Sequence, residues 1–487
     1  MDAPPRRMRV AIAGASGFVG RALIEAVASD HDVVALTRSA EGRPGAGSVA
    51  WRGCDLFNLR EAEEAVRGCD AAFYLVHSMM PSTRLAQGAF EDMDLLCADN
   101  LARAARTAKL RHIIYLGGLV PARSQEPLSR HLESRLEVEQ TLAAHGVPVT
   151  TLRAGMVVGA GGSSFQMMTR LVRRLPLMLG PRWTRSRSQS IALTDIIALL
   201  RYALDHPELS GHAYDVGCPD VVSYAEMLVL TGAALGKRTR VVTLPITTPR
   251  LSLLWISLVA GAPSELVRPL IESLRHDMVA SDGLVLQARA GREGMSLRAA
   301  IDEAVKGQAA QDRSGRPAAP TRSAPPRGHA QSLARSVQRL PCPPGRDAAW
   351  VAAEYVRWLP RFMRPFLRVD VDAAGTCRFF AWPVRRPLLV LAFAAERSAP
   401  DRQLFYVTGG LLVRGVAEAA VPARARARLE FRSVLGDACV LAAVHDFAPR
   451  LPWRVYAVTQ ALVHLLVMKR FGGHLGKLSR RPAAAPT

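Results

Sequence analysis

The stretch Met8-Arg-Val-Ala-Ile-Ala-Gly14-Ala-Ser-Gly17-Phe-Val-Gly20 decides the fold of the first part of the chain. Residues 9–13 are apolar after Arg9 and predict a β-strand, and residues 21–29 have the apolar spacing of a helix. Three glycines in such a strand–turn–helix are typical of a dinucleotide site. Gly14 allows a tight turn, Gly17 lets the backbone approach a pyrophosphate, and Gly20 lets helix and strand pack closely. The helix start would supply amide donors to the phosphates. The alternative is a glycine-rich turn without a ligand.

The chain around this turn alternates between short β-rich runs and helical stretches. Further strands are expected at 32–37, 71–76, 112–116 and 150–152, and further helices at 59–66, 92–109 and 132–145. This alternation predicts an α/β fold, a Rossmann-type doubly wound parallel sheet. A further α/β portion extends to about residue 305. Within it, Ser223 and Glu226 have the spacing of a capping box at a helix start.

Changes in composition predict the domain boundaries. Residues 1–305 are expected to form the Rossmann-type domain with a small substrate-side portion. Residues 306–346 are rich in Pro, Arg, Ala, Gly and Ser and contain few large apolar residues, which predicts a linker. Residues 347–478 are expected to form a second folded domain, followed by a disordered tail at 479–487.

The second domain is expected to be α+β. It starts with a helix at 348–359 and ends with a helix at about 452–471, with strands between them at 377–382, 388–394, 403–412, 427–433 and 439–447. The closing helix has an apolar stripe formed by Val455, Val458, Leu462, Leu465 and Leu466. Core packing explains this stripe, and a position on a membrane surface is the alternative.

Two roles are compatible with the sequence of the second domain. It could bind a lipid-like ligand, or it could serve in scaffolding or dimerisation. Its sequence outline is similar to α+β domains that hold hydrophobic ligands, with a sheet wrapped around a C-terminal helix. Four residues of this domain could suggest a metal site: His445, Asp446, His464 and His474. Their spacing matches no metal-ligand motif, so no metal is expected.

Composition excludes several classes of protein. The 487 residues carry a net charge of +21, but only five of the 63 basic residues are Lys and aromatic residues make up 6%. The preference for Arg over Lys is typical of a GC-rich genome. Because few aromatic residues accompany the basic ones, no nucleic-acid partner is expected.

The seven Cys residues form no C-x-x-C pair, which disfavours zinc and disulfide frameworks. The chain shows no apolar signal region, and its apolar runs at 251–263 and 455–468 are too short to span a bilayer. A cytoplasmic protein is expected, with peripheral membrane contact left open.

The end of the second predicted strand selects between cofactors. NAD sites commonly place an acidic residue there for the ribose 2′-hydroxyl. Here the sequence is Leu36-Thr37-Arg38-Ser39, without a carboxylate. Arg38 could form a charge-assisted fork with a 2′-phosphate, so NADP(H) is preferred and NAD(H) is the alternative. The competing interpretation makes Arg38 a solvated surface residue.

Several further motifs, read with the glycine turn, carry a family resemblance. They are Cys54-Asp-Leu56, Tyr74-Leu-Val-His-Ser78, Ile114-Tyr-Leu-Gly-Gly118, residues 128–139, Leu152-Arg-Ala-Gly155 and Tyr214-Asp-Val-Gly217. With these motifs, residues 8–300 resemble the atypical branch of the short-chain dehydrogenase/reductase superfamily. More narrowly, the chain is similar to NAD(P)H-binding NmrA-like proteins that carry an added C-terminal domain.

The resemblance implies positions for residues around the cofactor. Ser16, Phe18 and Val19 would complete the cofactor-binding glycine turn. Asp55 and Leu56 would lie beside the adenine. The remaining implied contacts follow later strands: Leu75, Val76 and His77 flank the cofactor, Gly117 and Gly118 lie near the nicotinamide, and Arg153, Ala154 and Gly155 lie on the substrate side.

The catalytic positions depart from the family pattern. Typical members use a Ser after the fifth strand and a Tyr-x-x-x-Lys whose Tyr is the acid/base. Here Gly117-Gly118 stands at the Ser position, and the Tyr-x-x-x-Lys window reads His131-Leu-Glu-Ser-Arg135. His131 could do acid/base work near neutral pH and Arg135 could hold a ribose, although Arg lacks the deprotonation chemistry of Lys. Alternatively, His131 and Arg135 are surface residues one helical turn apart.

Three functions are compatible with these residues. The first is an NADP-dependent oxidoreductase that passes hydride between the nicotinamide and a carbonyl or activated double bond of a hydrophobic, isoprenoid-like small molecule, with His131 as proton donor. The second is a non-catalytic NADP(H)-binding redox sensor or assembly factor. The third is an epimerase that uses bound NAD, which the missing carboxylate after the second strand disfavours. The sequence indicates neither the substrate nor the oligomeric state.

Overall fold

A computed structural model describes residues 7–40, 43, 45, 47–77, 85–121, 127–244, 272–281, 283–313, 333–414 and 427–480. The chain divides into two compact units. The N-terminal unit comprises Met1–His77 and Asn100–Ser323, and the C-terminal unit comprises Ser78–Asp99 and Ala324–Thr487. The predicted apolar run at 251–263 lies outside the described residues, as do residues 314–332 of the predicted linker and residues 481–487 of the predicted tail.

A seven-stranded parallel sheet forms the centre of the N-terminal unit, as predicted. Its order is β12-β7-β6-β4-β1-β2-β3, with β1 at Arg9–Ala13, β2 at Asp32–Thr37, β3 at Val49–Gly53, β4 at Ala71–Tyr74, β6 at His112–Gly118, β7 at Val149–Ala154 and β12 at Ala213–Val216. The strand order reverses direction at β1, between β2 and β4. In doubly wound sheets such a reversal opens a crevice at the carboxyl ends of the strands, where ligands bind.

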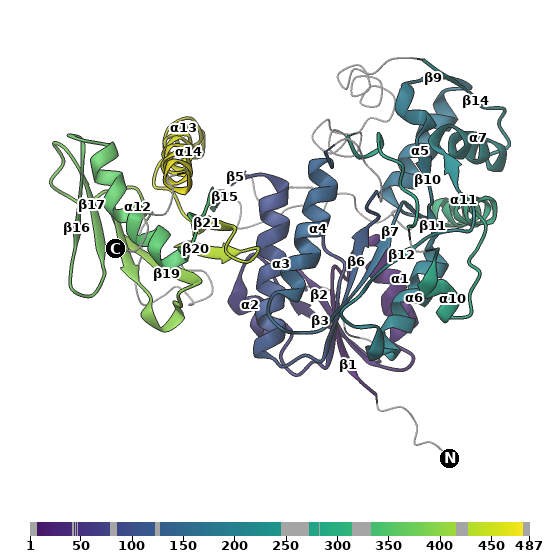
Figure 1. Cartoon of the computed structure of the whole chain (residues 1–487), viewed down its shortest axis with the longest axis horizontal. Helices are drawn as coiled ribbons and strands as arrows, with labels where there is room; N and C mark the ends of the chain where they lie inside the picture. Colours follow the sequence, from purple (N-terminus) through teal and green to yellow (C-terminus); the bar gives the residue numbers. More distant parts are fainter. Residues whose placement is uncertain are drawn as a thin grey trace. The chain divides into compact units, whose positions relative to one another are not determined.

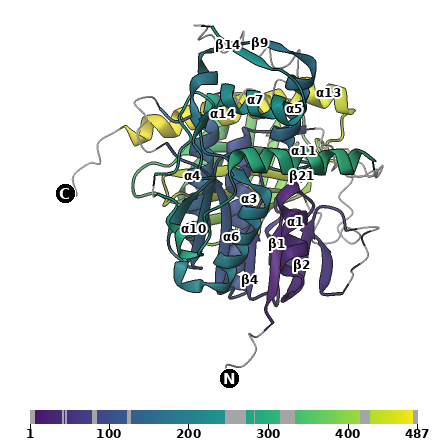
Figure 2. The same cartoon turned by 90° about the vertical axis from the view of Figure 1, so that its right-hand side faces the viewer.

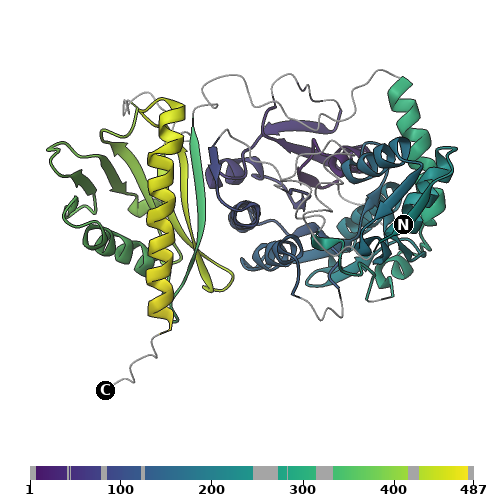
Figure 3. The same cartoon turned by 90° about the horizontal axis from the view of Figure 1, so that it is seen from above.

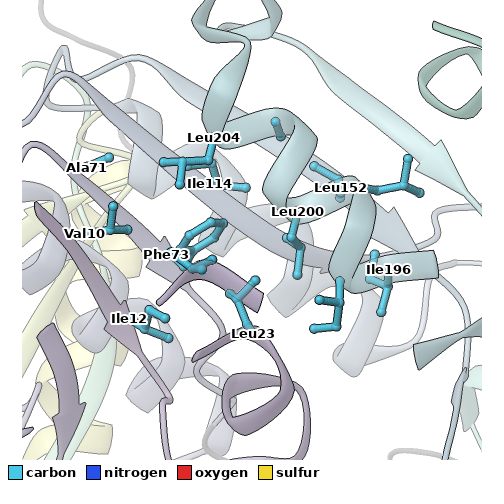
Figure 4. Close-up of a cluster of buried hydrophobic side chains, with 14 of the residues drawn as sticks. Val10, Ile12, Leu23, Ala71, Phe73, Ile114, Leu152, Ile196, Leu200 and Leu204 are labelled. Carbon is cyan, nitrogen blue, oxygen red and sulfur yellow. The ribbon is translucent and has the colours of Figure 1, made fainter. Parts of the chain in front are cut away.

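Helices cover both faces of this sheet (Figure 1). They are α1 at Phe18–Val27, α2 at Leu59–Ala65, α3 at Phe90–Thr107, α4 at Arg130–Ala143 and α6 at Leu193–Asp205. Val10 and Ile12 of β1 and Phe73 of β4 point to the face under α1 and α6, where they pack against Leu23 and Leu200 (Figure 4). These side chains are fully buried, so each removes its apolar surface from water and holds the glycine turn on a rigid strand.

A smaller portion of the N-terminal unit has its own core. Its helices are α5 at Ser163–Arg174, α7 at Tyr224–Ala234 and α11 at Leu297–Arg313, whereas α10 at Val285–Arg289 packs against the core of the main sheet through Leu286. Its short strand pairs are β8 (Val157–Val158) with β11 (Ile191–Ala192), β10 (Arg187–Ser188) with β13 (Val222–Ser223), and β9 (Leu177–Gly180) with β14 (Arg240–Thr243). Figure 2 shows β9 and β14 beyond α5 and α7. Ser223 and Glu226 form the predicted capping box at the start of α7.

The C-terminal unit is built on a second, mainly antiparallel sheet, as an α+β domain requires. Its order is β16-β17-β18-β19-β20-β21-β15-β5, with β5 at Leu85–Gln87, β15 at Ala334–Pro341, β16 at Leu367–Val371, β17 at Cys377–Ala381, β18 at Leu389–Phe393, β19 at Arg402–Gly409, β20 at Arg428–Val434 and β21 at Cys439–Phe447. The helices are α12 at Ala348–Phe362, α13 at Trp453–Val458 and α14 at Gln460–Ser479. The long helix α14 lies along the sheet (Figure 3), and its Phe471 is fully buried in the core.

The boundaries differ from the prediction in two places. Part of the expected linker is structured, because α11 continues to Arg313 and β15 occupies Ala334–Pro341. β15 pairs with β21 on one side and with β5 on the other, and its Val337 and Leu340 are buried. Residues 78–99 also group with the C-terminal unit, although they lie inside the expected N-terminal domain. The positions of β15 and of residues 78–99 come from strand pairing between distant segments, which local composition does not encode.

The closing helix also differs from the prediction. It is interrupted at Thr459, and Val455, Val458, Leu462 and Leu466 are exposed instead of packing in the core. The buried stripe of α14 is formed by Ala461, Val467, Met468, Phe471 and Leu475. Among the described residues, no helix is both long enough and apolar enough to cross a bilayer.

Candidate functional site

The predicted glycine turn lies between β1 and α1. The backbone of Gly14 has φ +91°, a conformation that residues with a side chain rarely adopt. The Gly17 amide donates to the Gly14 carbonyl at 2.9 Å. Gly17 is the N-cap residue of α1 and is exposed, whereas Gly20 is buried. A Cβ at Gly20 would lie 2.3 Å from the Gly14 oxygen, so the turn requires glycine there. The result is a helix start with its amide groups directed toward a solvent-facing turn, which suits phosphate.

The neighbouring residues of the turn are held by local contacts. The Ser16 carbonyl accepts a bond of 3.0 Å from Arg21 Nε. The ring of Phe18 lies against the loop after β8, since a Cβ at Gly159 would approach Phe18 Cζ to 2.9 Å. Val19 packs against the core under α1. The turn therefore has a fixed shape.

The residues that follow β4 contact the glycine turn that follows the neighbouring strand β1. The Leu75 amide donates to the Ala13 carbonyl at 3.0 Å, and a Cβ at Gly14 would lie 3.0 Å from the Leu75 carbonyl carbon. Leu75, Val76 and His77 are half-buried and follow the last residue of β4. The structure thus brings the glycine turn and the 75–77 segment together at the carboxyl edge of the sheet.

The ends of β2 and β3 form the next part of this edge. Arg38 is the first residue after β2 and is exposed. In the loop after β3, Asp55 accepts from the Phe57 amide at 3.2 Å and its own amide donates to Glu61 at 2.9 Å. The Leu56 carbonyl accepts a buried bond of 2.7 Å from Asn100 Nδ2. Arg38, Asp55 and Leu56 therefore follow neighbouring parallel strands, where the resemblance places the adenosine end of a cofactor.

The end of β6 contacts α4 at the other side of the edge. Gly118 is in van der Waals range of Arg135, because a Cβ there would lie 3.5 Å from Arg135 Cγ. The Arg135 guanidinium lies 3.5 Å from the Tyr115 hydroxyl, which is 3.3 Å from the Arg135 carbonyl. Neither Gly117 nor Gly118 offers a hydroxyl, so this strand end supplies no Ser to a catalytic set.

His131 lies beside His77, with ring centroids 5.0 Å apart. Burial, together with the smaller effects of the nearby Arg135 and His77, lowers the pKa of His131 to about 2. At neutral pH the ring is therefore neutral. A neutral ring can form hydrogen bonds but carries no additional proton to release at neutral pH, and the role of His131 as proton donor stays a prediction.

Arg153, which the resemblance places on the substrate side, has an acidic partner within the N-terminal unit. Its guanidinium forms a bidentate ion pair with Glu139 of α4, with distances of 2.7 and 3.0 Å. Ala154 is buried, and its carbonyl accepts from the Leu119 amide at 3.0 Å. Both residues lie at the carboxyl end of β7, as expected, but the ion pair directs Arg153 toward α4.

Two site residues, Asn100 and Tyr115, were not predicted. Asn100 fixes the backbone of the loop after β3 from 44 positions away, and Tyr115 contacts Arg135 from 20 positions away. Tyr115 is present in one of the quoted motifs, so its position could have been read from the strand that it occupies. No local pattern marks Asn100.

The described residues contain no group of three or more His, Cys, Asp or Glu side chains placed to hold a metal ion. In the C-terminal unit, His445 lies 3.4 Å from Glu430, and His474 lies 2.9 Å from Glu354. Each of these two histidines therefore lies beside a single glutamate side chain.

A comparison with protein families matches the part of the chain that contains the glycine turn and the 75–77 segment. Residues 6–248 match the NmrA-like family. Over these residues, the chain belongs to the NmrA-like family. This agrees with the resemblance that the motifs carry.

A curated relative of this NmrA-like chain is the auxiliary protein GraX of Staphylococcus aureus. The two are 26% identical over 144 residues, which is 29% of this chain. The aligned part spans 43% of the length of GraX, so the comparison concerns less than half of that protein.

Several solved structures are similar to the NmrA-like chain at low sequence identity. A nucleoside-diphosphate-sugar epimerase of Staphylococcus aureus is 17% identical, with a TM-score of 0.49, and covers 61% of this chain and 100% of its own. An NADPH-dependent quinone oxidoreductase of Escherichia coli, complexed with NADPH, is 18% identical (TM-score 0.47; 60% and 98%). The triphenylmethane reductase of Citrobacter sp., complexed with NADP(H), is 16% identical (TM-score 0.47; 61% and 99%). The Rossmann-type fold itself follows from the strand order and the glycine turn, independently of these likenesses.

Proposed function

We propose that the N-terminal unit binds NADP(H) across the carboxyl edge of its parallel sheet. The observation that carries the proposal is the turn at Gly14, Gly17 and Gly20. Its N-cap residue Gly17 is exposed, and added side chains at Gly14 and Gly20 would meet backbone atoms, so the turn presents its backbone to solvent, as pyrophosphate binding requires. The amides at the start of α1 would hold the phosphates, and the loops after β3 and β4 would hold the adenosine and the central part of the cofactor.

Arg38 is the reason to propose NADP(H) over NAD(H). It is exposed at the end of β2, directly beside the strand that carries the glycine turn. A guanidinium there forms charge-assisted hydrogen bonds to a 2′-phosphate, whereas a 2′-hydroxyl needs an acceptor such as a carboxylate. Residues 36–39 contain no carboxylate.

Calorimetric titration with NADPH, NADH, NADP⁺ and NAD⁺ tests this proposal. The natural protein should bind NADPH more tightly than NADH. Arg38→Ala should weaken NADPH binding by about ten- to a hundredfold and leave NADH binding nearly unchanged, because only the bond to the phosphate is lost. Arg111→Ala is the matched control, since Arg111 is exposed and precedes β6 at the opposite edge of the sheet. Equal losses for both cofactors with Arg38→Ala would overturn the assignment.

The reaction that fits this site is reduction of a hydrophobic small molecule. A bound NADPH supplies a hydride to a carbonyl or activated double bond. Leu132, which is next to His131 in α4, belongs to a buried apolar cluster with Leu119 and Met278, and an apolar environment near the site favours an apolar substrate. Arg135 would hold the nicotinamide ribose from its place against Gly118. The neutral ring of His131 would orient substrate by a hydrogen bond, and the proton would come from solvent.

A second candidate function is a non-catalytic NADP(H)-binding sensor. Two observations favour it: Gly117 and Gly118 provide no hydroxyl at the expected catalytic position, and His131 is held neutral by its surroundings. A sensor would bind NADPH and NADP⁺ with different affinities and would consume neither.

Oxidation of NADPH in the presence of a panel of quinones and other apolar carbonyl compounds separates the two candidates. A reductase consumes NADPH with at least one compound, and a Gly17 variant that loses cofactor binding loses this activity. A protein that binds NADPH tightly but consumes none with any compound is a sensor.

A further inference from the structure

One end of the C-terminal sheet exposes large apolar side chains to solvent. We name it the aromatic end, and it comprises Phe362 at the end of α12, Phe366 before β16, and Trp382 and Val384 after β17. Trp382 is 74% exposed and Phe366 is 59% exposed. Exposed Trp and Phe side chains side by side are unusual on a protein surface that faces only water, and such patches mark interaction sites.

The register of the sheet places the two largest of these side chains next to each other. β16 pairs with β17 so that Leu367 lies opposite Ala381, and the Trp382 amide donates to the Phe366 carbonyl at 2.9 Å. Phe366 and Trp382 are therefore directly opposite across the strands, on the same face of the sheet. Leu367 and Phe379 point to the other face, where they pack in the core. The Phe366–Trp382 pair thus lies on the face away from the core.

Basic residues lie close to this pair in the sequence. Arg361, Arg364, Arg385 and Arg386 are exposed and lie within the same two segments. Among the described residues, none of these four forms an ion pair with a carboxylate. The sequence has no Asp or Glu between Glu354 and Asp370, nor between Asp372 and Glu396. The aromatic end therefore combines an apolar centre with a rim of unneutralised positive charge.

We infer that the aromatic end docks on an anionic membrane surface, with Trp382 and Phe366 in the headgroup region and the four arginines on lipid phosphates. Trp is favoured at the membrane–water interface, and Arg can reach charged headgroups while its stem stays in an apolar environment. Basic residues near such a surface add attraction that does not require a specific lipid. No spanning segment is needed for this peripheral contact.

Two other occupants fit the observations less well. A symmetric contact between two copies would bring the same patch of each chain together and place eight guanidinium groups in one interface. A nucleic acid would need a series of open ring faces for base stacking, but of the four side chains of the aromatic end only Trp382 and Phe366 offer one, because Phe362 is stacked on Trp358 at 4.6 Å. Val384 offers no ring at all.

Flotation of the full-length protein with vesicles tests the inference. Vesicles of phosphatidylglycerol should retain the protein, and vesicles of pure phosphatidylcholine should retain much less. Phe366→Ser combined with Trp382→Ser should abolish retention. Arg385→Gln combined with Arg386→Gln should weaken it by about 30-fold and reduce its dependence on salt. NADPH binding and the thermal unfolding midpoint should be unchanged in both variants, because these side chains are exposed.

The matched control removes exposed apolar surface elsewhere in the same unit. Leu462→Ser combined with Leu466→Ser alters α14, where both side chains are about half exposed. This variant should float like the natural protein. The inference is overturned if the natural protein does not float with phosphatidylglycerol, or if only the α14 variant loses retention. It is also overturned if the aromatic-end variant changes only self-association or binding of single-stranded nucleic acid.

Discussion

Arg432 and Asp99 form an ion pair of 2.8 Å although 333 positions separate them in the sequence. Both side chains are almost completely buried. Arg432 also binds Glu430, which in turn binds Arg402 at 2.5 Å and lies 3.4 Å from His445. Burial alone would raise the pKa of Glu430, but the two guanidinium groups more than offset this and hold its pKa well below the usual value. The first half of α3 is therefore attached to the C-terminal sheet through buried charges.

The first prediction concerns this charge cluster. Glu430→Gln should lower the free energy of unfolding of the C-terminal unit by about 3–5 kcal/mol, because it leaves two buried guanidinium groups with Asp99 as the remaining carboxylate. Urea unfolding followed by tryptophan fluorescence measures this loss. The control is Asp370→Asn, which removes an exposed pair with Arg368 in the same sheet and should cost less than about 1 kcal/mol. Equal losses in the two variants would contradict the prediction.

The same ion pair shows what the sequence could and could not predict about the fold. The strand–turn–helix at 9–27 and the capping box at Ser223 are local patterns, and the structure confirms both. Residues 334–341 are poor in large apolar residues, and this composition predicts a linker where the structure has a strand. Its stability comes from pairing with β21, about a hundred positions away, and no local pattern records such a partner.

The second prediction concerns pH. Burial lowers the pKa of His112 to about 4, compared with 6.5 for an ordinary His. Between these values the unfolded chain binds a proton that the folded chain does not, so stability is lost as the pH falls from about 7 toward 4. Lowering the pH from about 7.5 to about 5.5 should cost about 1 kcal/mol from this residue alone.

A variant isolates the contribution of His112. His112→Gln keeps a polar group for the Thr150 hydroxyl, which lies 2.7 Å from the imidazole, but does not titrate. Urea unfolding at the two pH values should show a smaller loss for this variant than for the natural protein. An unchanged loss would assign the pH dependence to the other buried histidines, such as His445 and His464, whose pKa values are also lowered to about 4.

The third prediction separates two glycines of the turn. Gly20→Ala should destabilise the N-terminal unit by about 1–3 kcal/mol, because the new methyl group would lie 2.3 Å from the Gly14 carbonyl oxygen. At Gly17 the closest approach is 3.1 Å, φ is −74° and the residue is exposed, so Gly17→Ala should fold with little loss of stability. It should still weaken NADPH binding, since the methyl group occupies the approach of the pyrophosphate. Thermal unfolding and calorimetry on both variants measure these effects, and intact NADPH affinity in Gly17→Ala would contradict the placement of the phosphates.

The candidate site was predictable to the extent that strand ends determine it. Gly14, Arg38, Leu75 and Gly117 each follow or end a parallel strand, and parallel strands put their carboxyl ends on one edge. The properties of side chains from other elements were not predictable in this way. The ion pair of Arg153 with Glu139 and the neutral state of His131 depend on how α4 packs, which spacing along the helix does not specify.

The fourth prediction concerns His131 and depends on an active substrate from the quinone and carbonyl panel. Burial holds the pKa of this ring near 2, so the ring carries one N–H and no positive charge throughout the neutral range. The rate of NADPH oxidation should therefore not fall as the pH rises through 6.5. His131→Gln, which keeps a hydrogen-bonding side chain, should retain kcat within about tenfold, because general acid catalysis typically contributes about 10²–10⁴ and none is expected from a neutral ring. The measurement is a profile of kcat between about pH 5.5 and about pH 8.5 for both proteins, with Glu133→Gln as a control on the exposed side of the same helix. A rate that falls above pH 6.5 in the natural protein but not in His131→Gln would show that His131 is charged during turnover and donates the proton.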